Sequence, residues 1–345
     1  MKIVLTILSI LIGTAGLAQT PAGRSGAARA VPKGTAGASL SDTMAIQVML
    51  DRAGFSPGEI DGRPGSNFTS AVTAFQRAMG LAESGQVDPQ TEQRLADATA
   101  NQPALVEYDV READVAGPFT PTIPADLVQQ SKLKYLGYQN AREAIAERFH
   151  ASPQLLKRLN SAATFSRAGE RIQVPNVEPF EPPQPVAAPA QPGRGGASRG
   201  ESRGAAAPPA FTIAVTKSTS ALTVEDASGR VVFHAPVTTG SEHDPLPIGT
   251  WKVTTVQVMP KFHYNPDLFW DANPTHSKAT IPPGPNNPVG VAWIDLSKEH
   301  YGIHGAPEPS RIGHVQSHGC VRLTNWDARR VLVWAPPGTP VVFRE

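Results

Sequence analysis

The only cysteine of this 345-residue chain, Cys320, lies close in sequence to two histidines, His318 and His304. A thiol is a weak nucleophile until it loses its proton, and an imidazole can accept that proton. Gly319 leaves room beside the sulfur for a substrate carbonyl. The backbone N–H groups of Gly319 and Cys320 could then stabilise a developing oxyanion. This spacing predicts acyl transfer through a cysteine nucleophile.

The stretch resembles the catalytic signature of the L,D-transpeptidases with a YkuD-type domain. That family has an upstream His-Gly, then a Gly, then Ser-His-Gly-Cys, a small apolar residue and Arg or Asn. The matching residues here are His304-Gly305, Gly313 and Ser317-His318-Gly319-Cys320-Val321-Arg322. The resemblance implies a covalent thioester enzyme that acts on peptidoglycan stem peptides and uses no cofactor and no metal.

The resemblance also suggests roles for these residues. Cys320 is the expected nucleophile and His304 the expected base, with the carbonyl of Gly305 orienting the imidazole as the third member of a triad. The alternative base is His318, which we instead expect to hold the turn or the substrate.

Four residues are candidates for substrate binding: Ser317, Arg322, Tyr264 and Trp270. The Arg322 guanidinium suits a carboxylate of the stem peptide, although a role in the local fold is an equal alternative. Ser317 is as readily a turn hydroxyl. Tyr264 and Trp270 lie in the aromatic and proline-rich stretch 258–287, which we interpret as a lid or groove wall rather than an ordinary surface loop.

The family reaction begins with attack on the carbonyl between the third and fourth (D-Ala) stem residues, releasing D-Ala. An amine of a second stem then resolves the thioester and makes a 3→3 cross-link. Water as the acceptor would make the enzyme an L,D-carboxypeptidase. A lysine of an outer-membrane lipoprotein would make it an anchoring enzyme. The sequence leaves these three outcomes open, and the resemblance also predicts a carbapenem target.

Two other classes of function compete with this interpretation. His300-x3-His304 and His314-x3-His318 have the spacing of paired zinc ligands on a helix, which suggests a zinc hydrolase. Glycines and prolines between them disfavour that helix. The other rival is a non-catalytic wall-binding scaffold, which the intact set of Cys, His and Gly residues argues against.

The first residues predict export. Residues 1–18 combine Lys2, a short apolar run and a small-residue cleavage site, as in a secretory signal peptide. A membrane anchor would need about 20 apolar residues, so no stable membrane span is expected. We therefore expect a periplasmic or cell-wall protein. The net charge of +1 gives no reason to expect nucleic-acid binding.

Residues 39–100 predict a small all-α bundle that resembles a peptidoglycan-binding module. The matching residues are Asp61-Gly62, Gly65, Ala71-Val72, Phe75-Gln76, Gly80-Leu81 and Val87-Asp88. Pro64 and Phe68 depart from the family pattern, which puts wall affinity in question. The alternative is a bundle used only for packing or for docking a partner.

Residues 105–176 predict an α+β module of strand, helix, helix and strand. This order and the closing Gly169-x-x-Ile172-x-Val174-Pro175 resemble a LysM module, which binds N-acetylglucosamine chains. About twenty additional residues, 117–138, replace the usual tight turn before the first helix. The expected partners of the whole chain are thus glycan strands as well as stem peptides.

The remaining segments divide this multidomain chain. Residues 19–38 and the Pro/Ala/Gly-rich stretch 177–210 predict a disordered spacer and an extended tether. Residues 211–345 contain short alternating strands and predict a mainly-β domain. The family resemblance implies that this domain is a β-sandwich with the cysteine at the end of a groove.

Overall fold

The computed structural model describes residues 29–30, 38–183 and 211–345. The predicted signal peptide 1–18 lies outside the described residues, as do most of the spacer 19–38 and residues 184–210 of the predicted tether. Within the described ranges, no helix has the length and apolar character needed to cross a membrane.

The first region is a bundle of three helices, α1 (Ala38–Arg52), α2 (Ser66–Ala78) and α3 (Pro89–Ala98). Its core holds Leu50, Phe55, Ala71, Val72, Phe75 and Leu95, all buried. The carboxamide of the buried Gln76 accepts a hydrogen bond from the N–H of Gly85 and donates to the carbonyl of Gln86, which fixes the turn before α3. The helical prediction for this region is confirmed.

The second region has the expected strand–helix–helix–strand order. β2 (Leu105–Asp109) pairs antiparallel with β3 (Arg171–Pro175), and α6 (Ala141–Arg148) and α7 (Pro153–Leu159) lie between them in the sequence. Two short helices, α4 (Glu112–Ala116) and α5 (Leu127–Gln130), occupy the long connection after β2. β1 (Arg29–Ala30) pairs with the other edge of β2, so this part of the predicted disordered spacer is a strand.

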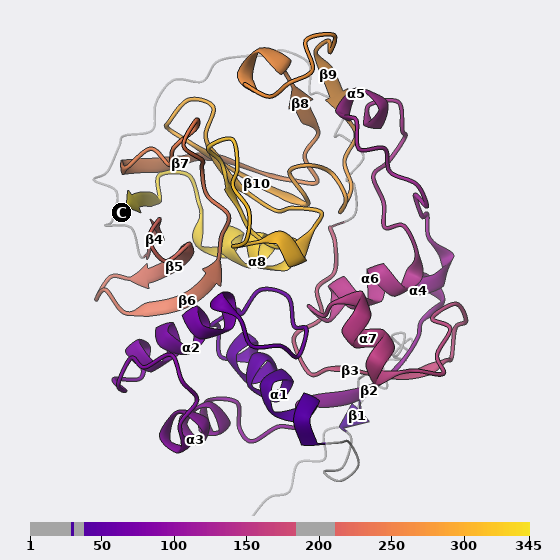
Figure 1. The fold of residues 1–345 in the computed structure, drawn as a ribbon, viewed down its shortest axis with the longest axis vertical. Coiled ribbons are helices and arrows are strands. Elements are labelled where there is room, and N and C mark those ends of the chain that lie inside the picture. Colours follow the sequence, from indigo (N-terminus) through magenta and orange to yellow (C-terminus); the bar gives the residue numbers. More distant parts are fainter. Residues whose placement is uncertain (1–28, 31–37, 184–210) are drawn as a thin grey trace, which may run out of the picture.

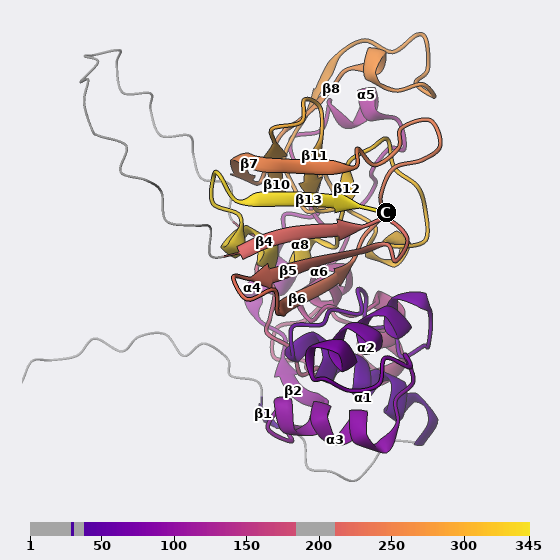
Figure 2. The same cartoon turned by 90° about the vertical axis from the view of Figure 1, so that its left-hand side faces the viewer.

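The third region contains one eight-stranded sheet (Figures 1 and 2). Its strands, in their order across the sheet, are β12 (Val321–Arg322), β11 (Gly302–His304), β10 (Ala292–Leu296), β7 (Gly249–Val258), β13 (Pro340–Arg344), β4 (Phe211–Thr216), β5 (Ala221–Asp226) and β6 (Val231–Pro236).

The expected sandwich is thus replaced by a continuous sheet that changes partners along β7. Residues 249–252 of β7 pair with β13, whereas residues 253–258 pair with β10. One long strand therefore joins two parts of a half-barrel. Helix α8 (Asn325–Val331), with the fully buried Trp326, contributes to the core of this domain.

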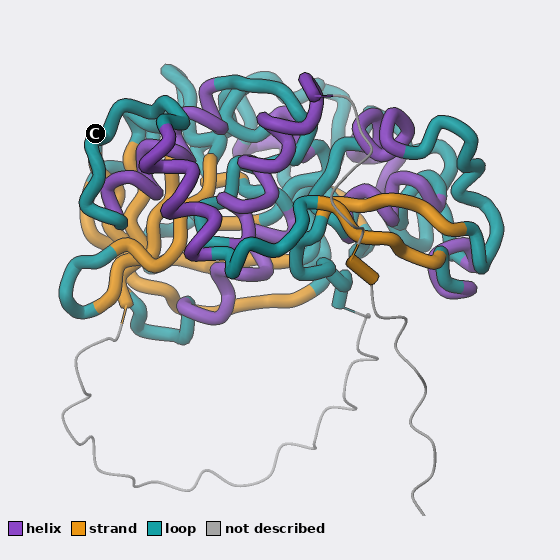
Figure 3. Tube along the Cα trace, turned by 90° about the horizontal axis from the view of Figure 1, so that it is seen from below, coloured by secondary structure: helices purple, strands orange, loops and turns teal. Residues whose placement is uncertain are grey.

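The helical bundle packs directly on the third region (Figures 2 and 3). Main-chain hydrogen bonds join Gly54 and Ser56 to His234, so this loop covers the free edge of β6. The Ser56 hydroxyl also donates to Asp327, and Arg330 forms a two-point ion pair with the buried Asp51.

The first and third regions are thus held together by direct contacts as well as by the chain that connects them. The first residues of the predicted tether are packed as well. Phe180 is buried in the core of the third region, and its N–H donates to the carbonyl of Arg148. The proline-rich composition predicted an extended chain. Composition alone could not show that Phe180 packs into the core of the third region.

The segment 117–138 extends from the second region to a small hairpin of the third, β8 (Phe262–Tyr264) and β9 (Ala279–Ile281). Figure 1 shows α5 beside β9. Leu136 exchanges main-chain hydrogen bonds with Pro283 and Asn286. An apolar cluster combines side chains of both segments: Ile123, Leu127, Val128, Leu133, Leu136, Phe262, Tyr264, Phe269, Ala279 and Ile281. The twenty additional residues of the second region thus support the predicted lid.

Candidate active site

His304 ends the short strand β11 and is 3% exposed. Its Nδ1 lies 2.6 Å from the carbonyl oxygen of Gly305. Because a carbonyl only accepts, Nδ1 carries the proton of the neutral ring and Nε2 keeps its lone pair. The ring stacks on Trp293 of β10, with centroids 5.3 Å apart and an interplanar angle of 18°. His304 is therefore held in the tautomer that a general base needs.

Burial sets the charge of this histidine. Desolvation, followed by the nearby Arg322 guanidinium, lowers the pKa of His304 to about 3, while the hydrogen bond to Gly305 acts in the opposite direction. The imidazole is thus neutral over the whole neutral range and able to accept a proton.

Cys320 lies directly before β12, and the parallel pairing places its side chain on the same sheet face as His304. The register pairs Ile303 with Val321 and His304 with Arg322. Because side chains alternate along a strand, Cys320 shares the face of Arg322. The thiol donates to the carbonyl of His300 at 3.8 Å and not to His304.

The thiol itself is protonated at neutral pH. Burial raises the pKa of Cys320, opposed by a hydrogen bond from the Gly302 backbone and by the charge of Arg322. Both shifts disfavour a resting thiolate–imidazolium pair. Chemistry at this site consequently needs proton transfer to a base during attack rather than a preformed ion pair.

The turn before the cysteine depends on glycine. Gly319 has φ +98°, and a Cβ there would come 2.7 Å from the ring of Tyr301. The Ser317 hydroxyl donates to the carbonyl of Cys320 at 2.7 Å, which closes the turn. No hydrogen bond within the described part of the chain occupies the N–H of Gly319 or Cys320. These two donors are therefore available to an oxyanion.

His318 contacts residues of the predicted lid. Its Nε2 lies 2.8 Å from the Asp271 carboxylate, and its ring makes an edge contact with Phe269. Trp270 is 60% exposed, and its ring stacks on that of His243 with the centroids 4.3 Å apart. The catalytic turn and the predicted lid are thus joined through His318.

The structure places Tyr264 differently from the sequence-based expectation. This residue is buried in the lid cluster, and its hydroxyl pairs with His276, which in turn contacts Asp126 of the second region. The sequence left open whether this stretch forms a lid or a groove wall, and it predicted substrate binding by Tyr264. Tyr264 instead lies inside the lid and connects it to segment 117–138.

Arg322 lies half-buried on the same face as His304 and Cys320. Across the described ranges no carboxylate lies within ion-pair distance of its guanidinium, and its Nε is buried without a hydrogen-bond partner. Burial lowers the pKa of Arg322, but the group stays cationic. The site therefore presents a positive charge beside the thiol that has no ion-pair partner among the described residues.

The predicted zinc ligands do not converge. In the part of the chain that the structure describes, no group of three or more His, Cys, Asp or Glu residues is placed to hold a metal ion. His304 and His318 have other partners, the carbonyl of Gly305 and the carboxylate of Asp271.

Two segments of the chain match known protein families. Residues 210–343 match the family described as "L,D-transpeptidase catalytic domain", and residues 39–95 match the "Putative peptidoglycan binding domain". The third region is an L,D-transpeptidase domain. It follows, in the same chain, the region that matches the putative peptidoglycan-binding domain.

Curated relatives of this transpeptidase domain occur in several bacteria. "Putative L,D-transpeptidase YkuD" of Bacillus licheniformis is 48% identical over 59 residues, 17% of this chain and 36% of that protein. "Putative L,D-transpeptidase YqjB" of Bacillus subtilis is 30% identical over 115 residues, 32% of this chain and 57% of that protein.

"Probable L,D-transpeptidase YbiS" of Escherichia coli K12 is 42% identical over 65 residues, 19% of this chain and 21% of that protein. The chain thus spans between about a fifth and three fifths of the lengths of these three relatives. Among solved structures, an L,D-transpeptidase from Mycobacterium smegmatis has a TM-score of 0.33 and 18% identity, covering 39% of this chain and 59% of that one. That likeness is too slight to support an argument about geometry.

Two residues of the transpeptidase site were missed by sequence reasoning. Trp293 forms the platform under His304, and Asn325 lies against Gly305. A Cβ on Gly305 would come 2.3 Å from Oδ1 of Asn325, which explains the glycine of the His-Gly pair. Thr324-Asn325, a helix start directly after the motif, was the available signal.

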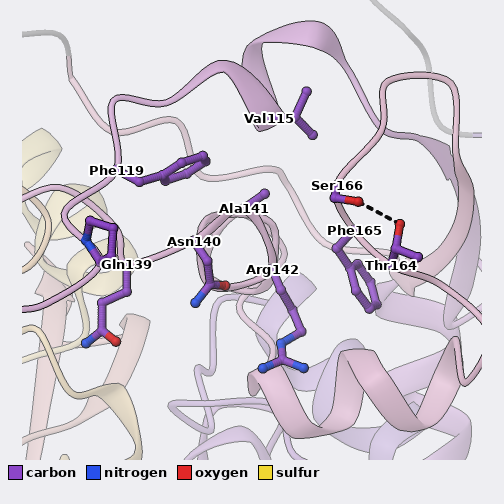
Figure 4. A pocket seen from close by; sticks show the side chains of 10 residues that line it. Val115, Phe119, Gln139, Asn140, Ala141, Arg142, Thr164, Phe165 and Ser166 are labelled. Carbon is purple, nitrogen blue, oxygen red and sulfur yellow. Dashed lines mark hydrogen bonds between the residues drawn. The ribbon is translucent and has the colours of Figure 1, made fainter.

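A second candidate site is lined by residues of the middle region (Figure 4). A cavity of about 420 Å³ opens between the connection that follows β2 and the loop between α7 and β3. Its lining combines apolar, amide and hydroxyl side chains with one guanidinium group, that of Arg142: Val115, Phe119, Pro121, Gln139, Asn140, Ala141, Arg142, Thr164, Phe165 and Ser166. Apolar faces beside amide and hydroxyl groups suit a neutral polar ligand.

Proposed function

We propose that this chain is a peptidoglycan L,D-transpeptidase with Cys320 as its nucleophile. The observation that carries the proposal is the neutral His304, with Nδ1–H held by Gly305 and Nε2 free, on the sheet face of the only cysteine in the sequence. The family matches of residues 210–343 and 39–95 support both the reaction and the wall substrate.

The first step forms a thioester. Rotation about the Cα–Cβ bond of Cys320 turns the thiol from His300 toward His304, whose Nε2 takes the proton as sulfur attacks the carbonyl between stem residues three and four. The N–H groups of Gly319 and Cys320 bind the oxyanion. The proton on His304 then passes to the nitrogen of D-Ala, which leaves as the C–N bond breaks.

The second step reverses the proton transfer. An amine of another stem attacks the thioester, His304 removes its proton, and the thiol is regenerated as the 3→3 amide forms. Water in place of the amine would give an L,D-carboxypeptidase, and a lipoprotein lysine would give anchoring of that protein to the wall. The Arg322 guanidinium, which lacks an ion-pair partner within the described residues, supports binding of a stem-peptide carboxylate.

Mass spectrometry of muropeptides incubated with the full chain tests this proposal. We expect 3→3 dimers and released D-Ala with the wild type and neither product with Cys320→Ala. Turnover by the Ala variant would end the nucleophile assignment. Trimmed tripeptides without dimers would identify the carboxypeptidase instead. No reaction from a folded wild type would favour the scaffold interpretation.

Glycan binding by the middle region is a second proposal. The order β2–α6–α7–β3 supports the resemblance to a LysM module, and the 420 Å³ cavity supplies a site for N-acetylglucosamine units between its two loops. Calorimetric titration of the full chain with chito-oligosaccharides should detect binding that Asn140→Ala weakens. Equal binding by both proteins would exclude this cavity.

Export to the periplasm or cell wall belongs to the same proposal. Its support is the sequence of residues 1–18 and the wall substrate that the matched families imply. N-terminal sequencing of the protein recovered from cells should find Gln19 as the first residue. An intact Met1 on the mature protein would contradict export by cleavage.

A further inference from the structure

A buried carboxyl group of the middle region reaches the transpeptidase domain behind its catalytic histidine. Glu147, on helix α6, is 6% exposed. Its Oε1 accepts a hydrogen bond of 2.8 Å from Nδ2 of Asn325, the first residue of helix α8. The two residues are separated by 178 positions.

The Asn325 carboxamide is fixed by three hydrogen bonds. Nδ2 donates to Glu147 and to the carbonyl of Pro285 at 2.9 Å, and Oδ1 accepts from the N–H of Val291 at 3.1 Å. A backbone carbonyl on one side and a backbone N–H on the other determine which way the amide points. Glu147 is the only side-chain partner among these three.

Asn325 in turn confines Gly305. Added Cβ atoms show how tight this contact is: at Gly305 the Cβ would lie 2.3 Å from Oδ1 of Asn325, and at Gly290 it would lie 2.1 Å from the same atom. The Gly290 Cβ would also lie 2.7 Å from the carbonyl carbon of Gly305. The peptide whose carbonyl orients His304 is thus packed between Gly290 and the Asn325 side chain.

We infer that Glu147 is a positioning residue for the catalytic base: it holds Asn325 against Gly305, whose carbonyl fixes the ring of His304. This inference rests on the proposed function of His304. It assigns to the middle region a part in the chemistry, in addition to any part in wall binding. Misplacement of a reacting group by about 1 Å can cost on the order of 100-fold in rate.

The charge of Glu147 agrees with a hydrogen-bonding role. Burial raises its pKa to about 8, opposed by the hydrogen bond from Asn325 and reinforced by Glu143 and Glu59 nearby. A neutral carboxyl group still offers its carbonyl oxygen to Nδ2 of Asn325. A glutamine side chain has the same size and the same acceptor, so it should replace Glu147 without loss.

The test compares two substitutions of similar size in the full chain. Glu147→Gln keeps the acceptor and Glu147→Met removes it, with Glu147→Ala as a second removal if Met disturbs folding. Cys320 acylation by a carbapenem is followed by intact-mass spectrometry, and the Nδ1–H signal of His304 by NMR. Thermal melting shows which variants are folded.

We expect Glu147→Met to slow acylation by about 10- to 100-fold and to weaken the Nδ1–H signal, and Glu147→Gln to match the wild type. Glu143→Ala is the matched control, because it removes another hydrogen bond between the same two regions, to Asn286, without touching Asn325. Its acylation rate should stay close to that of the wild type.

Three results would overturn the inference: wild-type acylation by a folded Glu147→Met or Glu147→Ala variant, equal losses in Glu147→Gln and Glu147→Met, or the same loss in Glu143→Ala. Failure of the wild type to be acylated would instead count against the proposed function. The Nδ1–H signal of His304 would still decide the positioning role in that case.

Discussion

The two sides of the active site are both supported by the middle region, but by different kinds of contact. On the base side, His304, Asn325 and Glu147 are buried, with His304 hydrogen-bonded to the carbonyl of Gly305 and Asn325 hydrogen-bonded to Glu147. On the lid side, an apolar cluster is combined with half-exposed polar pairs, and the Asp271 side chain is 48% exposed. Buried hydrogen bonds are costly to break, whereas exposed ion pairs contribute little. The base should thus stay fixed while the lid can move.

The largest expected effect distinguishes the two histidines. His304→Ala should slow carbapenem acylation of Cys320 by about 10²- to 10⁴-fold, the usual contribution of a positioned base. His318→Ala should cost less than about tenfold, because it releases the half-exposed pair with Asp271 and ring contacts to the lid rather than a group that touches the thiol's proton. Intact-mass spectra over time measure both rates. If the two losses are reversed while both proteins stay folded, His318 is the base.

The next effect concerns stability at the junction of the three regions. Arg330→Ala leaves the fully buried Asp51 with His150 as its remaining partner, which should cost about 3–5 kcal/mol of unfolding free energy. Asp126→Ala removes the more exposed pair with His276 on the lid side, together with the hydrogen bond from the N–H of Gln129 that caps α5, and should cost less unfolding free energy than Arg330→Ala. Denaturant unfolding of the full chain compares them, and equal losses would contradict the distinction between the two sides.

A smaller effect is expected at the lid. Asp271→Ala frees His318 and should raise KM for a stem tetrapeptide by about two- to fivefold, with kcat unchanged. Asp267→Ala is the matched control, because this lid carboxylate pairs only with the exposed Lys278, at 3.7 Å. A fall in kcat in the Asp271 variant would show that the lid contact also positions the reacting groups.

The smallest expected effect is that of mild acid. Since the pKa of His304 is lowered to about 3, protonation of the base should change the acylation rate by less than about twofold between pH 7 and pH 5. The lowered pKa also makes the free energy of unfolding depend on pH. The stability that the neutral, buried His304 contributes is present above the pKa of the unfolded state and is lost as the pH falls toward 3. A rate that halves near pH 6.5 would contradict this assignment.

The sequence predicted the candidate site best where its residues lie close together along the chain. The spacing of His304, Ser317, His318 and Cys320 identified the family, and the alternating strands and helical periods predicted the three kinds of region. The sheet face shared by His304 and Cys320 agrees with the predicted pairing of base and nucleophile. The roles of Arg322 and Trp270 in binding stay predictions.

Contacts between distant segments could not be obtained from the sequence. Glu147 and Asn325 belong to different helices, and no local period relates them. The burial of Tyr264 depends on segment 117–138, which the sequence presented only as an insertion. Phe180 was assigned to a tether because the assignment used the average composition of the segment. A single aromatic side chain in such a segment can still pack into the core of another region.

The junction of Asp51, His150 and Arg330 also bears on how far the enzyme could reach along the wall. Each residue comes from a different region, and the ring of His150 stacks on Trp326 with an interplanar angle of 6°. Regions locked in this way keep one direction and one distance between the peptidoglycan-binding domain and Cys320. Lengthening residues 184–210 would leave that distance unchanged. Under the proposed function, Cys320 would then act on stem peptides at a set distance from the glycan strand that the first region binds.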